Sequence, residues 1–150
     1  MAELEDYPIV VEQSVSWGQM DAFGHVNNVQ FFRFFEDARI AYFEALGIYD
    51  SDAPDSDEGG VGPILAETSC KFLAPLTYPD DLRIGARTTE LGESHFEIVY
   101  EIASESLDRP AARGDSVVVS YDYDRGEKVP VPAAWREAFV DLEGDAITTR

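Results

Sequence analysis

Cysteine and histidine are scarce in this chain, which has one cysteine, Cys70, and two histidines, His25 and His95. A single cysteine cannot close a disulfide within the chain, and it has no partner thiols for a zinc site. Two histidines are too few for most histidine-rich metal centres. The sequence therefore predicts a fold without disulfides and without a metal site.

Long apolar runs are also missing. No stretch approaches the ~20 uninterrupted apolar residues that a membrane-spanning helix needs. Residues 1–6 are acidic and lead into no apolar segment, so they do not have the pattern of a signal peptide. We therefore expect a cytoplasmic protein.

Basic residues are few, because 11 Lys and Arg face 30 Asp and Glu for a formal net charge of -19. A field so negative repels nucleic acid and anionic membranes, and neither is expected as a partner. The acidic residues are spread along the chain rather than gathered in a tail. That spread favours a halophilic surface over an acidic partner-binding segment, since molar salt shortens the screening length to about 3 Å.

Apolar residues, at 45% of the chain, are sufficient for one core. A domain of this size buries roughly 70% of its unfolded surface. We predict a single domain over residues 1–150, with an acidic loop at 50–60 and a flexible tail at 143–150.

The clearest predicted element is a helix over residues 28–46. Asn27 or Asn28 can cap its N-terminus, and Gly47 can supply the left-handed residue after its end. Apolar side chains recur at helical spacing on nearly all sides, which predicts a buried helix. They are Phe31, Phe32, Phe34, Phe35, Ala38, Tyr42, Phe43, Ala45 and Leu46.

Alternating segments predict five strands, at residues 9–17, 62–73, 82–91, 94–104 and 112–124. Short turns between the last four predict antiparallel neighbours, and residues 133–142 could form a second helix. One buried helix against one antiparallel sheet is an α+β domain. Alternation assigns one face of each strand to Ile9, Val11, Val15 and Trp17; Ile64, Ala66, Thr68, Cys70 and Phe72; Leu82, Ile84, Ala86 and Thr88; Phe96, Ile98, Tyr100 and Ile102; and Val117, Val119, Tyr121 and Tyr123. Cys70 is thus interpreted as a core residue rather than a nucleophile.

The residues of chemical interest lie just before the long helix, in the segment WGQMDAFGHVNN at 17–28. A helix N-terminus offers unpaired N–H groups and the positive end of the dipole, which can polarise a carbonyl and hold an oxyanion. Asp21, delivered beside it, could act as a nucleophile or as a general base. It could also be an ordinary loop or capping aspartate.

This pattern of Asp21, then Gly24-His25-Val26-Asn27-Asn28, then Glu36-Asp37-Ala38-Arg39, resembles the hotdog-fold acyl-CoA thioesterases of the 4-hydroxybenzoyl-CoA thioesterase type. The resemblance covers roughly residues 9–125. It implies an α+β hotdog fold, in which a five-stranded antiparallel sheet wraps around a long central helix. It also implies a thioester hydrolase that converts acyl- or aroyl-CoA to free acid and CoA without a cofactor.

The same resemblance assigns roles to individual residues. Asp21 and His25 are expected to be catalytic, and the residues expected to bind substrate are Gly24, Asn27, Asn28 and Glu36. His25 could instead fix the loop, Asn27 and Asn28 could be caps, and Glu36 could pair with Arg39 or lie at a subunit interface. Hotdog sites form between paired subunits, so a homodimer or homotetramer is implied.

One departure concerns position 19, where many relatives carry a second Asp and this chain has Gln19. Glutamine cannot ionise, so a mechanism that needs two carboxylates is placed in doubt. Two other functions stay open, a non-catalytic acyl-CoA-binding hotdog module and a hotdog enoyl-thioester hydratase. The residues available for CoA phosphates are Arg33, Arg39, Lys71, Arg83, Arg87 and Arg113.

Overall fold

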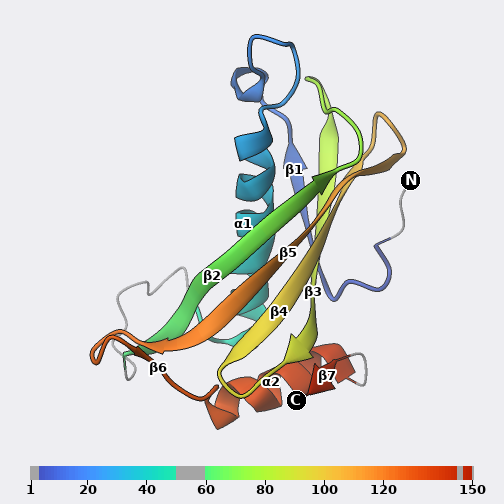
Figure 1. Cartoon of the computed structure of the whole chain (residues 1–150). Coiled ribbons are helices and arrows are strands. Elements are labelled where there is room, and N and C mark those ends of the chain that lie inside the picture. Colours follow the sequence, from blue (N-terminus) through green and yellow to red (C-terminus); the bar gives the residue numbers. More distant parts are fainter. Residues whose placement is uncertain (1–3, 50–59, 145–146, 150) are drawn as a thin grey trace.

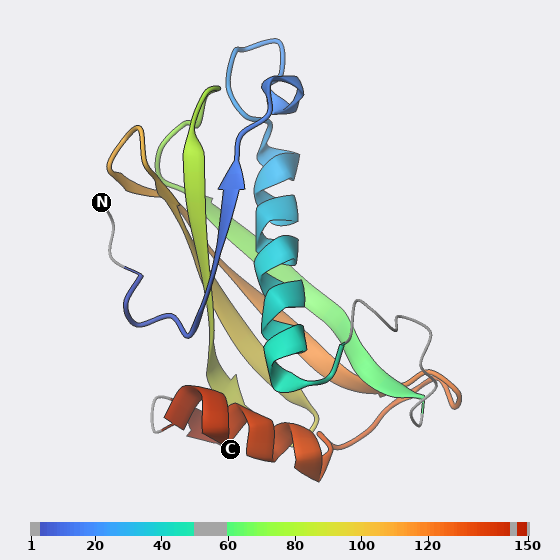
Figure 2. The same cartoon turned by 180° about the vertical axis from the view of Figure 1, so that it is seen from behind.

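The computed structural model describes residues 4–49, 60–144 and 147–149. Figures 1 and 2 show a curved sheet with one long helix along one of its faces and a second helix across one end. The α+β class predicted from the sequence is confirmed. In the part of the chain that is described, no helix is long and apolar enough to cross a membrane.

Five long strands form the sheet, in the order β1-β3-β4-β5-β2 with antiparallel pairing throughout. They are β1 (Ile9–Ser14), β2 (Val61–Phe72), β3 (Asp81–Leu91), β4 (His95–Ser104) and β5 (Arg109–Asp122). Two short strands that the sequence did not indicate extend the sheet, β6 (Glu127–Lys128) beside β5 and β7 (Thr148–Thr149) parallel to β3. Among the described residues, β1 and β2 form the two edges of the sheet.

The long helix α1 (Asn28–Leu46) has the bounds and caps that the sequence predicted. The Asn27 side chain accepts a hydrogen bond from the Val29 N–H, and Gly47 adopts a left-handed φ of 79°. The helix is buried on one broad face rather than on all sides. Exposed charged residues occupy the rest, namely Arg33, Glu36, Asp37 and Glu44.

The predicted inner faces of β3 and β4 are confirmed, since their alternate residues are at most 1% exposed. The prediction for β5 is wrong by one residue. Its buried side chains include Ser116, Val118 and Ser120, whereas Val117 and Val119 point outward and are half-buried. The Phe35 ring occupies the space that a β-carbon at position 114 would fill, so β5 needs a small residue there, and hydrophobic alternation cannot reveal such a preference.

The predicted inner face of β2 holds for Thr68, Cys70 and Phe72 but is wrong for Ile64, because a bulge between Leu65 and Glu67 interrupts the alternation. Leu65 and Thr68 stand opposite the buried Val118 and Ser116, so they share the inner face, while Ile64 lies on the outer face. Nothing in the described chain covers this inner face fully: Leu65 is 42% exposed and Phe72 is 49% exposed.

The structure differs from the prediction after the first strand and near the C-terminus. β1 ends at Ser14, and Trp17 begins a short 3-10 helix η1 (Trp17–Gln19) with its side chain 71% exposed. At the other end, helix α2 (Ala133–Glu143) is held by Glu143, whose Oε2 accepts from the Tyr42 hydroxyl at 2.5 Å and from the Thr88 N–H at 2.8 Å. Glu143, from which a flexible tail was predicted, is thus the last residue of α2. The predicted acidic loop lies outside the described residues except for Gly60.

Candidate active site

The loop between η1 and α1 is a tight turn that presents Asp21. Met20 and Val26 form an isolated antiparallel bridge. Inside it, the Asp21 N–H donates to the His25 carbonyl at 2.9 Å, and the Gly24 N–H donates to the Asp21 carbonyl at 3.0 Å. Gly24 has a φ of 79°, a conformation that residues with a Cβ rarely adopt. Gly24 therefore serves the turn that places Asp21.

The Asp21 carboxylate is exposed to solvent and oriented by two donors. Oδ1 accepts from the Phe23 N–H at 2.9 Å, which forms an Asx turn, and Oδ2 accepts from Asn27 Nδ2 at 3.3 Å. Asp21 therefore does stabilise the loop, as an ordinary loop aspartate would. The same bonds hold the carboxylate in one orientation, where it stays open to an incoming ligand.

The N-terminus of α1 offers a free donor beside this loop. Asn27 Oδ1 accepts from the Val29 N–H, and the Asn27 carbonyl accepts from the Gln30 N–H at 2.9 Å. The Asn28 N–H has no partner in the part of the chain that the structure describes. A free N–H at the positive end of a 19-residue helix is suited to a carbonyl oxygen that gains negative charge.

An apolar cavity of about 330 Å³ adjoins these groups. Asn28 and His25 line one side of it, and aromatic and aliphatic side chains line the rest. Its other lining residues are Val26, Phe31, Phe72, Leu73, Ala74 and Pro75. The rings of Phe31 and Phe72 meet edge to face with centroids 4.9 Å apart. The cavity has the size and lining for an aliphatic or aromatic acyl group.

Glu36 is not part of this cluster. It lies eight residues after Asn28, or about 12 Å along the helix axis. It lines a separate cavity of about 330 Å³ between α1 and β2, together with Val29, Phe32, Arg33, Arg39, Leu65 and Thr68. The structure therefore gathers Asp21, Gly24, His25, Asn27 and Asn28 and leaves Glu36 apart.

The buried Glu36–Arg39 pair that was considered from the sequence does not form. Glu36 is exposed, whereas Arg39 is 9% exposed and donates from Nη1 to the Tyr100 hydroxyl at 3.2 Å. Burial raises the pKa of Tyr100 above 10.0, and it outweighs the guanidinium, which acts to lower that pKa.

Position 19, where the sequence departs from the family pattern, supports the loop. The side-chain oxygen of Gln19 accepts from the Ser16 N–H at 2.8 Å, and the backbone carbonyl of Gln19 accepts from the Asn27 N–H at 2.9 Å. Sequence reasoning gave these contacts no role. It also missed Phe23, whose ring is 88% exposed at the turn beside Asp21. The sequence did offer a signal for Phe23, because an aromatic residue stands there between Asp21 and the turn residue Gly24.

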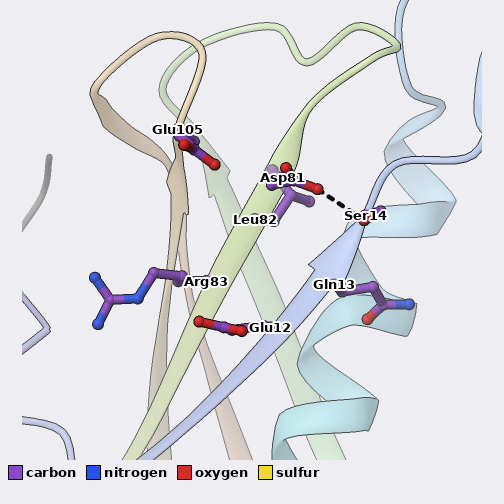
Figure 3. A pocket seen from close by; sticks show the side chains of 7 residues that line it. All are labelled: Glu12, Gln13, Ser14, Asp81, Leu82, Arg83 and Glu105. Atoms are coloured by element: carbon purple, nitrogen blue, oxygen red, sulfur yellow. Dashed lines mark hydrogen bonds between the residues drawn. The ribbon is translucent and has the colours of Figure 1, made fainter.

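A polar cavity of about 360 Å³ lies away from this loop, on β1 and β3. Figure 3 shows the hydrogen bond from Ser14 Oγ to Asp81 Oδ1, at 2.7 Å, among its lining residues. Three carboxylates and one guanidinium line it, in the set Glu12, Gln13, Ser14, Asp81, Leu82, Arg83 and Glu105. That charge repels CoA phosphates, and the cavity holds none of the residues predicted for the catalytic site.

Several of the basic residues available for CoA are engaged elsewhere. Arg113 pairs with Glu101 at 2.8 Å, and Arg87 lies over the Tyr7 ring at 5.1 Å. Arg39 binds Tyr100, as described above. By contrast, Arg33 and Lys71 have no ion-pair partner within residues 4–49, 60–144 and 147–149.

Cys70 lies half-buried on β2, against the core. Burial raises the pKa of its thiol to about 11. Such a pKa keeps the thiol protonated at neutral pH, which disfavours it as a nucleophile. No group of three His, Cys, Asp or Glu side chains among the described residues is arranged to hold a metal ion.

Sequence and structure comparisons both relate this chain to thioesterases. The family model of the thioesterase-like superfamily matches residues 15–139. The uncharacterized protein YsmA of Bacillus subtilis (strain 168) is 31% identical over 117 residues, which cover 77% of this chain and 74% of YsmA.

Two solved structures are similar over almost their whole length. A thioesterase from Thermus thermophilus, complexed with coenzyme A and Zn, is 31% identical with a TM-score of 0.79, covering 93% of this chain and 97% of that one. A gentisyl-coenzyme A thioesterase is 25% identical with a TM-score of 0.75, covering 87% and 98%. The predicted hotdog fold is confirmed by these likenesses.

Proposed function

The chain belongs to the thioesterase-like superfamily, and we propose that it hydrolyses acyl-CoA or aroyl-CoA thioesters to the free acid and CoA. One observation carries the proposal. An exposed, oriented Asp21 carboxylate is hydrogen-bonded to Asn27, the N-cap of a helix whose Asn28 lines an apolar cavity and has no partner for its N–H among the described residues.

The chemistry follows from these groups. With the thioester carbonyl oxygen at the Asn28 N–H, the helix end stabilises the negative charge that develops there. Asp21 then acts in one of two ways. It attacks the carbonyl carbon, releases CoA and leaves an acyl anhydride that water hydrolyses, or it takes a proton from the water that attacks. No cofactor takes part in either route.

The acyl or aroyl group occupies the cavity lined by Phe31 and Phe72. An aromatic acyl group would pack against these two rings in a stacked or edge-to-face arrangement. Such a pair adds about 0.5–1.5 kcal/mol to the binding free energy beyond the contribution of buried apolar area. His25 lines the same cavity and orients the acyl group or the attacking water. Arg33 and Lys71 are the side chains we propose for the CoA phosphates.

We also propose that two copies of the chain pair through β2. This 12-residue strand is at one edge of the sheet, and its inner face is not fully covered by the described chain. Exposed Leu65 and Phe72 on β2 are apolar, and an unpaired edge carries unsatisfied N–H and C=O groups. A second β2 satisfies these groups and covers Leu65. Light scattering that shows only monomer at micromolar concentration would refute this pairing.

We further propose that the net charge of -19 reflects a halophilic surface. Self-repulsion among the carboxylates destabilises the folded chain at low ionic strength, and molar salt screens it. The melting temperature should rise steadily from about 0.05 M to about 2 M KCl. A melting temperature unchanged by salt would contradict the proposal.

Thiol release from a panel of short-chain, long-chain and aromatic acyl-CoAs, measured in molar salt, tests the function. The proposal predicts hydrolysis of at least one class, and the preferred class identifies the acyl group. A burst of CoA ahead of the free acid in wild type, lost in Asp21→Asn, identifies Asp21 as a nucleophile. Tight CoA binding without turnover indicates a binding module, and addition of water to an enoyl-CoA indicates a hydratase.

A further inference from the structure

Asn27 has one side-chain amide that serves two groups at once. Its Oδ1 accepts from the Val29 N–H at 2.9 Å and so caps α1, while its Nδ2 donates to Asp21 Oδ2 at 3.3 Å. Resting on the function proposed above, we propose that Asn27 is a positioning residue, which fixes the Asp21 carboxylate relative to the first turn of α1.

The orientation of the amide follows from its partners. The Val29 N–H is a donor, so it must face the amide oxygen, and a carboxylate accepts only, so it must face the amide nitrogen. Reversing the amide would break both contacts. The cap and the contact to Asp21 therefore form together, and helix formation sets the direction of the Nδ2 donor.

The backbone on both sides of this contact is already fixed. Asp21 donates to the His25 carbonyl, and Asn27 donates from its backbone N–H to the Gln19 carbonyl at 2.9 Å. What is left free is the rotation of an exposed Asp21 side chain. Two donors limit it from two directions, the Phe23 N–H on Oδ1 and Asn27 on Oδ2.

The residue type matters because other caps cannot do both tasks. Ser, Asp and Asn cap helices about equally well. Serine keeps a capping oxygen but has no amide that extends to Asp21. Aspartate keeps the oxygen but places a second negative charge beside the first. Of the three, only asparagine combines the acceptor for Val29 with a donor for Asp21.

These differences give matched variants, Asn27→Ser and Asn27→Asp, which keep the cap. We expect melting temperatures within about 2 °C of wild type, because the substituted caps are nearly equivalent. In Asn27→Ser, kcat should fall about 10-fold to 100-fold with KM nearly unchanged, since a misplaced catalytic group loses rate rather than binding. In Asn27→Asp, the acid limb of the pH–rate profile should move to higher pH by roughly one unit, because neighbouring carboxylates hold protons more tightly.

Failure of this inference is distinct from failure of the proposed function. If the wild type hydrolyses thioesters and both variants keep its kcat and pH profile, Asn27 is only a cap and the inference is overturned. If the wild type hydrolyses nothing, NMR couplings that report the χ1 rotamer of Asp21 still decide. One rotamer in wild type and a rotamer average in Asn27→Ser support the contact, and the same single rotamer in both overturns it.

Discussion

The ring of Phe35 on α1 lies against the backbone of Gly114 on β5, in the space that a β-carbon would occupy. The same ring stacks on Tyr100 of β4, with centroids 4.8 Å apart and planes 16° apart. The absence of a side chain on Gly114 therefore makes room for the Phe35 ring. This contact belongs to the core that carries α1, and with it the N-terminus that borders Asp21.

Gly114→Ala should destabilise the protein by about 1–3 kcal/mol, because the added methyl overlaps the Phe35 ring and lies 2.8 Å from the Ser69 carbonyl oxygen. Gly18→Ala is the matched control, since a β-carbon there has no neighbour within 4 Å among the described residues. Urea unfolding measures both. Equal stability of the two variants would show that the helix can move away from β5 at no cost.

Glu143 attaches α2 to the rest of the fold through Tyr42 and Thr88. Glu143→Ala should cost about 2–3 kcal/mol, because two donors lose a charged acceptor. Glu143→Gln keeps an acceptor oxygen and should cost clearly less. Thermal unfolding of the two variants should differ by several degrees, and coinciding curves would mean that α2 is held by its apolar face alone.

Glu97 on β4 stands opposite Glu90 on β3. Burial, followed by the neighbouring Glu90 carboxyl, raises the pKa of Glu97 above 4.5. The folded state then binds this proton more tightly than the unfolded state. This group's favourable contribution is complete below about pH 4.5 and is lost as pH rises through the folded-state value.

Glu97→Gln should therefore raise the melting temperature at pH 7 and low salt, by roughly 1–3 °C. The gain should disappear at pH 4, where wild-type Glu97 is protonated. Glu93→Gln, an exposed acid in the turn before β4, controls for the change in net charge. A gain that is the same at both pH values, or that Glu93→Gln reproduces, would assign the effect to overall charge.

Cys70 should be dispensable for catalysis. Because burial raises its pKa to about 11, native protein should react slowly with iodoacetamide at pH 8, and protein unfolded in urea should react at the rate of a free thiol. Cys70→Ala should keep wild-type thioesterase turnover. Rapid alkylation of the native thiol with loss of activity would place Cys70 at the site instead.

Much of this architecture follows from local sequence signals. α1 was predicted with its bounds and caps because Asn27, Gly47 and the spacing of its phenylalanines are all local. The inner faces of β3 and β4 were predicted for the same reason. The errors lie where distant contacts decide. Phe35 fills the space over Gly114, and β5 turns Ser116 and Ser120 inward beside Val118, so its inner face is not the one that apolar alternation indicates.

The candidate site shows the same division. The motif around Asp21 lies in one continuous segment, so the loop cluster was predictable from its order in the chain. The distance between Glu36 and the loop cluster follows from the rise of the helix, although the motif placed Glu36 and the loop residues in one site. The bulge after Leu65 left no clear sequence signal, and neither did the two roles of Asn27, which depend on how the loop folds back onto the helix.

The most direct test compares thioester hydrolysis by wild type, Asp21→Asn and Asp122→Asn. Asparagine can still accept the Phe23 N–H, so Asp21→Asn keeps the turn and removes the charge. Asp122 is the matched control, a turn aspartate that accepts from the Asp124 and Arg125 N–H groups at 3.0 and 3.1 Å, away from the candidate site. The account predicts that kcat falls by about 100-fold or more in Asp21→Asn alone, with its melting temperature near wild type. Undiminished hydrolysis by Asp21→Asn would show that Asp21 only forms the loop, and would contradict the account.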